Sequence, residues 1–294
     1  MQARRHIREV TSPGRARKTV QAKPTLIIEA GRTERHYWRD LWRYRELFYF
    51  LAWRDILVRY KQTVIGVLWA LIRPLLTIVV FTVVFGKLAK LPSDGVPYPI
   101  LVCAAMLPWQ FFASAFSEVG NSLVGNANLI SKTYFPRLLI PASTVVVAFV
   151  DFLISLLILA GLMAWYGLFP DWRALALPAF ALVAAAAALG IGLWIAALNV
   201  RYRDFRYLIP FLMQIGLFIS PVGFSSSVVP DQWRLLYSLN PMVGVIDGFR
   251  WSLVGGHVQL YLPGFALSML LIAVLLLSGI AYFRRTERTF ADVI

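Results

Sequence analysis

Cysteine is almost absent from this chain, and histidine is rare. The one cysteine, Cys103, lies in an apolar run, so neither an intrachain disulfide nor a cysteine metal cluster can form. The three histidines, His6, His36 and His257, do not have the spacing of a metal site. No arrangement of serine, histidine and aspartate suggests nucleophilic catalysis. The sequence therefore predicts no metal site and no catalytic residues.

The chain also lacks a phosphate-binding loop. Such a loop needs glycine directly before a lysine that is followed by serine or threonine, so that backbone amides surround the phosphate. The nearest sequence, Lys132–Thr133, follows Ser131 instead. We expect no cofactor in this chain, and any ATP and Mg²⁺ must be bound by a partner subunit. A relay of intramembrane carboxylates and an evident internal repeat are missing too, which argues against proton-coupled and inverted-repeat carriers.

Charged residues are scarce and strongly biased in sign. They make up 15% of the chain, yet 29 lysines and arginines against 15 acidic residues give a net charge of +14. Apolar residues make up 59%, and the mean hydropathy is +0.67. This composition is more apolar than that of a soluble domain and indicates an integral membrane protein. Long uncharged runs do not suit a nucleic-acid-binding protein, so we expect no nucleic acid partner.

Six apolar runs are long enough to cross about 30 Å of hydrocarbon at about 1.5 Å per residue. The third, fourth and sixth are nearly free of charge, whereas the second and fifth contain prolines. The runs are residues 64–85, 99–116, 140–168, 174–198, 207–224 and 262–283. The predicted fold is an all-α membrane protein with six transmembrane helices.

The positive charges predict the orientation of these helices. Of the 29 lysines and arginines, 23 lie in the N-terminal stretch, the second and fourth connections, or the C-terminal tail. The opposite side has five, among them Arg234 and Arg250. Because positive residues stay in the cytoplasm, we expect a multi-pass protein of the inner (cytoplasmic) membrane with both termini cytoplasmic. The first 25 residues contain no apolar centre, so membrane insertion is expected to depend on the first span.

Three regions follow from this pattern. Residues 1–24 are basic and aperiodic, and we expect a disordered tail that either lies on anionic lipid or meets a specific partner. Residues 25–63 form a cytoplasmic or interfacial amphipathic region. Within it, residues 36–61 alternate aromatic and charged side chains at helical spacing, which suits a helix in the headgroup layer or one packed on a partner. Residues 64–294 form the six-span transmembrane domain with a cytoplasmic C-terminal tail.

Residues 225–261 do not resemble an ordinary loop. Asn240–Pro241 is a helix N-cap followed by proline in the first helical position, and Gly255 is a plausible C-terminal stop. The run 242–253 that they enclose is too short to span a membrane, and a second short run, 231–239, precedes it. We therefore predict two short re-entrant helices before the last span, dipping into the bilayer from the outer face.

Ionisable and aromatic residues supply the candidate site. Within the spans, Arg73 could line a conduit or reach the headgroups, and Asp151 could line a conduit or pair with another helix. Aromatic rings stack on the C–H faces of sugars, although an ordinary interfacial aromatic belt explains any single residue as well. The aromatic residues considered for a conduit are Trp109, Phe112, Phe116, Phe218, Phe224, Trp233, Tyr237, Phe249 and Trp251.

Three stretches resemble the permease subunits of ABC exporters for O-antigen-type and teichoic-acid-type polysaccharides. They are residues 51–88 (LAWRDILVRYKQTVIGVLW…), 125–143 (GNANLISKTYFPRLLIPAS) and 199–255 (NVRYRDFRYLIPF…YSLNPMVGVIDGFRW…). The resemblance covers about residues 45–290 and includes the order of the segments. The long basic N-terminal tail departs from the shorter members of the family.

The resemblance implies a homodimer that binds two copies of an ABC ATPase and moves an undecaprenyl-diphosphate-linked polysaccharide outward. It implies that the connection after the second span docks on the ATPase; the residues concerned are Asn126, Asn128, Ser131, Lys132, Tyr134 and Phe135. As a hypothesis, a basic collar of Arg54, Arg59, Lys61 and Arg73 would meet the diphosphate at the cytoplasmic gate. The alternatives are an ABC permease for a drug or lipid, and a membrane-embedded enzyme of glycolipid assembly.

Overall fold

The computed structural model describes residues 37–61, 64–202, 204–255, 258 and 260–290, with the backbone alone at 64–71 and 73. Contacts divide the chain into Met1–Tyr37 and Trp38–Ile294, and the helices described below belong to the second unit except for Tyr37, the first residue of α1. Throughout the described ranges, every regular element is helical. The predicted all-α class is confirmed, whereas the predicted tail at residues 1–24 lies outside the described residues.

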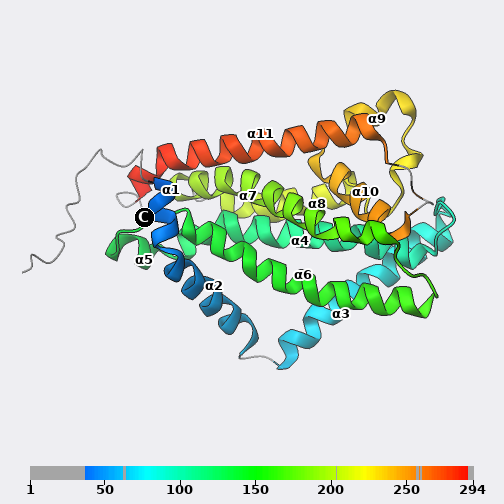
Figure 1. Cartoon of the computed structure of the whole chain (residues 1–294), viewed down its shortest axis with the longest axis horizontal. Helices are drawn as coiled ribbons and strands as arrows, with labels where there is room; N and C mark the ends of the chain where they lie inside the picture. The colour runs from blue at the N-terminus through cyan, green and yellow to red at the C-terminus, as the bar shows by residue number, and fades with distance from the viewer. Residues whose placement is uncertain (1–36, 62–63, 203, 256–257, 259, 291–294) are drawn as a thin grey trace, which may run out of the picture. The chain divides into compact units, whose positions relative to one another are not determined.

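Within the residues that the structure describes, four helices are long and apolar enough to cross a membrane. Their sequences are apolar around most of the helix circumference, as expected for helices that meet lipid or other helices on every side. They are α4 (Tyr98–Gly125), α6 (Leu139–Trp165), α7 (Leu177–Arg201, preceded by the 3₁₀ turn η2, Trp172–Ala176) and α11 (Leu262–Thr286). Helix α4 packs between α6 and α7, and α11 packs on the other side of α7 (Figure 1).

The other two expected spans differ from these four in the described residues. Helix α3 (Val64–Phe81) continues into a π-helical segment, η1 (Thr82–Leu88), while α8 (Phe205–Ile219) is a single helix of 15 residues. Helix α8 ends before the predicted 224 because Pro221 forces Ser220 out of helical geometry, to φ −98° and ψ 151°. The described residues therefore contain four candidate spans, and the six-span count remains a prediction.

The amphipathic region forms two helices, α1 (Tyr37–Arg43) and α2 (Arg45–Tyr60). One side of α2 packs on α6 through the buried Leu51. The other side leaves Tyr49, Phe50 and Trp53 exposed. The interfacial placement of this segment remains a prediction. A further short helix, α5 (Ala127–Lys132), connects α4 to α6.

Two short helices precede α11 at the predicted places, α9 (Asp231–Tyr237) and α10 (Pro241–Val254). The Asn240 Oδ1 atom accepts a hydrogen bond from the Met242 amide at 3.0 Å, which caps the start of α10. Gly255 ends the helix at φ +62°, a conformation that glycine adopts without steric cost. Helix α10 is buried against α4, α7 and α11. Whether these helices are re-entrant remains a prediction.

Glycine allows α7 and α11 to approach closely. A Cβ atom placed on Gly190 would lie 2.7 Å from the Leu276 amide nitrogen. A Cβ atom on Gly279 would lie 2.3 Å from the Gly190 carbonyl oxygen. Both contacts are with backbone, which cannot rotate away as a side chain can. The pair therefore fixes how closely these two helices cross, as small residues do between membrane helices.

Candidate functional site

The α5 connection presents polar side chains on its surface. Asn128, Ser131 and Lys132 are exposed, and Tyr134 is 57% exposed. Phe135 is buried and anchors the segment from beneath. Among the residues predicted to dock on the ATPase, four are thus accessible to a partner and one holds the connection in place.

The segment after α11 holds the end of the α5 connection that leads into α6. The Arg137 amide donates a hydrogen bond to Glu287 Oε1 at 2.6 Å, and its guanidinium donates to the Glu287 carbonyl oxygen. The same guanidinium lies 6.0 Å from the ring of Phe290, which packs on Phe283. The 3₁₀ turn η5 (Glu287–Thr289) therefore fixes the backbone where the connection enters α6.

Helix α2 is attached to α6 by an ion pair. Arg59 Nη2 lies 2.8 Å from Asp151 Oδ2, and Arg59 Nη1 lies 3.5 Å from Glu118 Oε1. The Tyr60 hydroxyl donates a hydrogen bond to Asp151 Oδ1. Burial, and secondarily the bond to Asp151, raise the pKa of Tyr60, so the hydroxyl stays protonated and keeps donating. Asp151 therefore pairs with another helix, one of its two predicted roles.

The other members of the predicted basic collar lie in different settings. Arg54 Nη2 donates to Asn126 Oδ1 at 2.9 Å and also pairs with Asp55 at 2.7 Å. Because Asn126 begins the α5 connection, Arg54 links the amphipathic helix to the predicted docking segment. Lys61 is exposed at the end of α2. The side chain of Arg73 lies outside the described residues.

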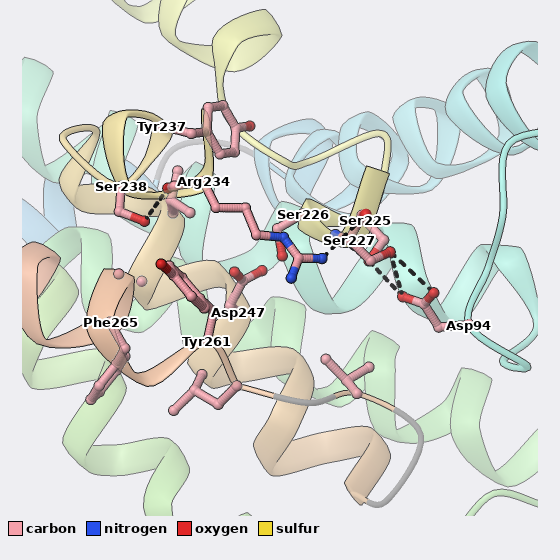
Figure 2. A pocket seen from close by; sticks show the side chains of 15 residues that line it. Asp94, Ser225, Ser226, Ser227, Arg234, Tyr237, Ser238, Asp247, Tyr261 and Phe265 are labelled. Atoms are coloured by element: carbon pink, nitrogen blue, oxygen red, sulfur yellow. Dashed lines mark hydrogen bonds between the residues drawn. The ribbon is translucent and has the colours of Figure 1, made fainter. Parts of the chain in front are cut away.

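A polar pocket lies among α9, α10 and the start of α11, and we call it the α9–α10 pocket. It has a volume of about 300 Å³. The polar groups that line it include Asp94, Ser225, Ser226, Ser227, Arg234, Tyr237 and Asp247, and the aromatic residues Tyr261 and Phe265 complete the wall. Figure 2 shows Arg234 and Asp247 converging from α9 and α10, with Asp94 bonded to the serines.

The wall of this pocket is held by hydrogen bonds between segments far apart in sequence. The Ser225 hydroxyl donates to Asp94 Oδ2, and the Ser227 hydroxyl donates to Asp94 Oδ1 at 3.2 Å. Arg234 donates to the carbonyl of Ser227 at 3.3 Å and pairs with Asp231 at 3.0 Å. The connection after η1 and the 3₁₀ turn η3 (Ser226–Val228) are thereby joined to α9.

Arg250 is buried behind the pocket, with 1% of its surface exposed. Its guanidinium donates to three carbonyl oxygens, those of Leu101 at 3.3 Å, Phe224 at 2.9 Å and Val222 at 3.3 Å. These carbonyls belong to α4 and to the non-helical segment after α8. Arg250 thus joins α10 to both. In the sequence this residue counts only among the positive charges of the outer side, and no sequence pattern indicates that its guanidinium satisfies buried backbone carbonyls.

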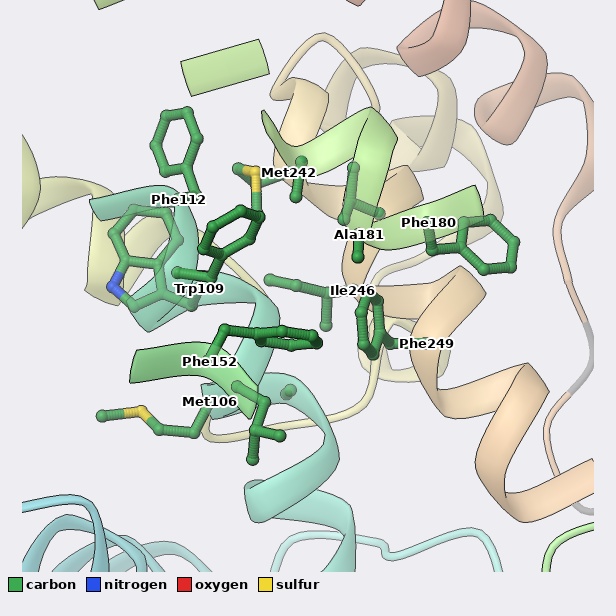
Figure 3. Close-up of a cluster of buried hydrophobic side chains, with 14 of the residues drawn as sticks. Met106, Trp109, Phe112, Phe152, Phe180, Ala181, Met242, Ile246 and Phe249 are labelled. Atoms are coloured by element: carbon green, nitrogen blue, oxygen red, sulfur yellow. The ribbon is translucent and has the colours of Figure 1, made fainter. Parts of the chain in front are cut away.

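Four of the aromatic residues proposed for a conduit lie in the core instead. Trp109, Phe112, Phe116 and Phe249 are buried. Figure 3 shows Trp109, Phe112 and Phe249 within the cluster of apolar side chains. Trp109 is covered by α8, since a Cβ atom on Gly216 would lie 2.5 Å from its ring. Trp109, Phe112 and Phe116 pack in a row along α4, whereas Phe249 packs against Phe152 and Phe180. Their contribution is to packing, which aromatic contacts at ring distances of 5.6–6.0 Å support.

The remaining aromatic candidates are accessible to different degrees. Phe218 on α8 is 61% exposed, and Trp233 on α9 is also exposed. Phe224 and Tyr237 are half-buried with ring centroids 6.5 Å apart. Trp251 is half-buried beneath the Arg173 guanidinium, 5.1 Å from it. The structure therefore brings together Phe224 and Tyr237, and it leaves Phe218 and Trp233 on the surface.

The sequence patterns do not single out Asp94, Asp247 or the three consecutive serines. A possible signal is the run Ser225–Ser227 after a proline-interrupted span, because hydroxyl groups next to a membrane segment need partners. The acidic partners lie more than 15 residues away on either side of that run, and no local pattern indicates which carboxyl group meets it.

These features define a class: a helical membrane protein with a polar connection between two of its long helices and a pair of short helices before its last span. The chain belongs to the ABC-2 type transporter family, whose profile matches residues 46–254. It is therefore a transporter permease subunit and not an enzyme, as predicted. Membership implies an ABC ATPase partner and a multi-pass place in the inner membrane.

Curated relatives extend this likeness over most of the chain. The chain is 26% identical to the O-antigen export system permease protein RfbA of Klebsiella pneumoniae, over 85% of its own length and 95% of the relative. It is 27% identical to the protein of the same name from Myxococcus xanthus, over 87% and 98% of the two chains. The predicted resemblance to polysaccharide-exporter permeases is confirmed.

Proposed function

We propose that this chain is the membrane-spanning subunit of an ATP-driven exporter for an undecaprenyl-diphosphate-linked polysaccharide of the O-antigen type. The polymer moves from the cytoplasm across the inner membrane, and a separate ABC subunit binds ATP and Mg²⁺. The observation that carries the proposal is the likeness to permeases named for O-antigen export, which covers 95–98% of their length.

The working unit that we propose is a homodimer with the conduit between its two copies. A hydrophilic polymer needs a lined path across about 30 Å of hydrocarbon, and in this proposal two chains enclose it. Helix α8 supports this arrangement, because it exposes Tyr207, Phe211 and Phe218. With 15 residues, or about 23 Å, it is also too short to cross the bilayer alone. In this proposal α3 and α8, with their flanking segments, complete a six-span protomer.

The ATPase is proposed to dock on the α5 connection from the cytoplasmic side, with one copy on each protomer. The exposed Asn128, Ser131, Lys132 and Tyr134 support this role, since a partner can reach all four. The positive-inside pattern supports cytoplasmic termini on the same side. Helices α9 and α10 would then lie toward the outer face as the re-entrant pair.

Depletion in the native host tests the function. We expect lipid-linked polysaccharide to accumulate in the cytoplasm while the cell surface loses it. Normal surface polysaccharide on depletion would overturn the substrate assignment and point to a drug or lipid exporter of the same family. Restoring the chain from a plasmid serves as the control and should return the polymer to the surface.

The proposed diphosphate contact needs a sharper design, because Arg59 also holds α2 against α6. Arg59→Gln removes the positive charge and its pairs with Asp151 and Glu118. Asp151→Asn removes the pair with Asp151 but keeps the charge of Arg59 and an amide oxygen that can still accept the Tyr60 hydroxyl. If Arg59 meets the diphosphate, Arg59→Gln lowers export more than Asp151→Asn does. Equal losses from the two variants would assign Arg59 to the attachment of α2 alone. Lys61→Gln tests the collar at an exposed position.

A further inference from the structure

The α9–α10 pocket contains two buried polar atoms that have no hydrogen-bond partner among the described residues, although the Asp247 carboxyl group also bonds to Ser226. Asp247 is 8% exposed, and its Oδ1 atom has no hydrogen-bond partner among the residues that the structure describes. The buried hydroxyl of Tyr237 likewise meets no partner within the described part of the chain. Both residues line the pocket. Since leaving a buried polar group without a partner costs about 1–3 kcal/mol, such groups commonly mark the position of a ligand.

The charges that line the pocket limit what it can bind. Two carboxyl groups, Asp94 and Asp247, line the pocket together with one guanidinium, Arg234, which already pairs with Asp231, and Arg250 behind the wall attracts Asp247 as well. An anion would be repelled by the carboxylates. A divalent cation would meet Arg234, and no cluster of three or more acidic, histidine or cysteine side chains occurs in the described ranges. A neutral ligand with several hydroxyl groups suits this mixture of donors and acceptors.

The remaining wall supplies the other half of carbohydrate recognition. Tyr261 and Phe265 present aromatic rings at the pocket, and sugar C–H faces pack on such rings. The Arg234 guanidinium lies 5.9 Å from the Tyr261 ring, so one aromatic wall stands close to the polar one. The volume of about 300 Å³ is at the lower limit of ligand pockets, which suits a single ring better than an oligomer.

We propose that the α9–α10 pocket binds one neutral sugar unit of the exported glycan, with Asp247 and Tyr237 hydrogen-bonding its hydroxyl groups and Tyr261 stacking on its face. This inference rests on the proposed function and adds to it a recognition site within the permease chain. The site is separate from the exposed surface of α8 and from the α5 connection.

Direct binding measurements on the full chain with its ATPase subunit in lipid nanodiscs test the proposal. Saturation-transfer-difference NMR is recorded with D-glucose, D-galactose, D-mannose and N-acetyl-D-glucosamine in turn, and inorganic phosphate is measured by its ³¹P signal. We expect at least one sugar to bind. Asp247→Asn and Tyr261→Ala should each weaken it about tenfold or more, the usual effect of losing a hydrogen bond to a charged group or a stacking platform.

A matched control and a second variant keep the result decisive. Asp171→Asn changes an exposed carboxyl group and should leave sugar binding within about twofold of the unaltered chain. Should Asp247→Asn fail to fold, Tyr261→Ala, which keeps the buried carboxyl group, decides the outcome. Binding of none of the four sugars, equal binding by both pocket variants and the control, or binding of phosphate instead would overturn the proposal.

The export assay separates this inference from the proposed function. If depletion removes surface polysaccharide but the pocket binds no sugar, the exporter assignment stands and the recognition site is wrong. If depletion leaves surface polysaccharide unchanged, the exporter assignment fails, and sugar binding to the pocket would then have to be explained by another substrate.

Discussion

Replacing Arg250 is the most direct test of how the short helices are held. Arg250→Met keeps the apolar stem of the side chain but removes the guanidinium that joins α10 to three carbonyl oxygens. The carbonyls of Val222 and Phe224 lie outside helical segments, so these acceptors lose a buried donor. The carboxyl group of Asp247 loses the electrostatic attraction of Arg250 as well.

The expected loss of stability is large because Arg250 is almost completely shielded from water. Removing one member of a buried charged network typically costs about 3–5 kcal/mol, and with 1% exposure Arg250 has little water to replace it. Arg250→Lys should lose less stability than Arg250→Met, yet it should remain less stable than the unaltered chain. A single ammonium group cannot reach three carbonyls from different segments as a planar guanidinium does.

The free energy of unfolding is measured on the purified chain in mixed micelles by increasing the proportion of sodium dodecyl sulfate. Arg206→Met removes an exposed arginine and should change it by less than about 0.5 kcal/mol. The double variant Arg250→Met with Asp247→Asn should be less destabilised than the two single losses added together, because both buried charges are removed. The reasoning is refuted if Arg250→Met lies within about 1 kcal/mol of the unaltered chain.

Three further variants test other contacts by the same unfolding measurement or by hydrogen exchange. Gly190→Ala should destabilise the chain by roughly 1–3 kcal/mol because the added Cβ meets the α11 backbone. Gly161→Ala, which has open space around the added Cβ, should be neutral or stabilising. Equal effects of the two variants would contradict this reasoning. Glu287→Ala should speed hydrogen exchange in the α5 connection by freeing the Arg137 amide, and unchanged protection there would count against the tether. Asn240→Ala should cost about 1 kcal/mol as a lost N-cap, and Asn240→Asp, which keeps the accepting oxygen, should cost less.

Features governed by neighbouring residues could be predicted from the sequence. The bounds of α10 follow from Asn240–Pro241 at its start and Gly255 at its end, and the structure has both. The long helices follow from the length of the apolar runs. Two helix ends differ clearly from the prediction. Helix α4 continues past the predicted 116 to Gly125. Helix α8 ends early, although Pro221 was expected within the span. Its preceding residue is extended, and the helix stops at Ile219.

Features governed by distant contacts could not be predicted. Arg250 meets the Leu101 carbonyl 149 residues away, and nothing near Arg250 in sequence indicates that acceptor. The helical spacing of Trp109, Phe112 and Phe116 correctly suggests a common face. It cannot indicate that the face is covered, which depends on the close approach of α8 at Gly216. The same holds for the α9–α10 pocket, whose wall combines Asp94 with residues more than 100 positions later.

Cys103 has a practical consequence that follows from its burial. It is the single cysteine of the chain, it sits within α4, and none of its surface is exposed. A thiol reagent will therefore modify the native protein slowly, and new cysteines can be introduced without first removing the old one. If α8 lies at the junction between two copies of the chain, a cysteine placed at Phe211 or Phe218 would crosslink one copy to the other. Cysteines at Ser131 and Trp233 would report, by labelling from either side of the membrane, which way the protein faces.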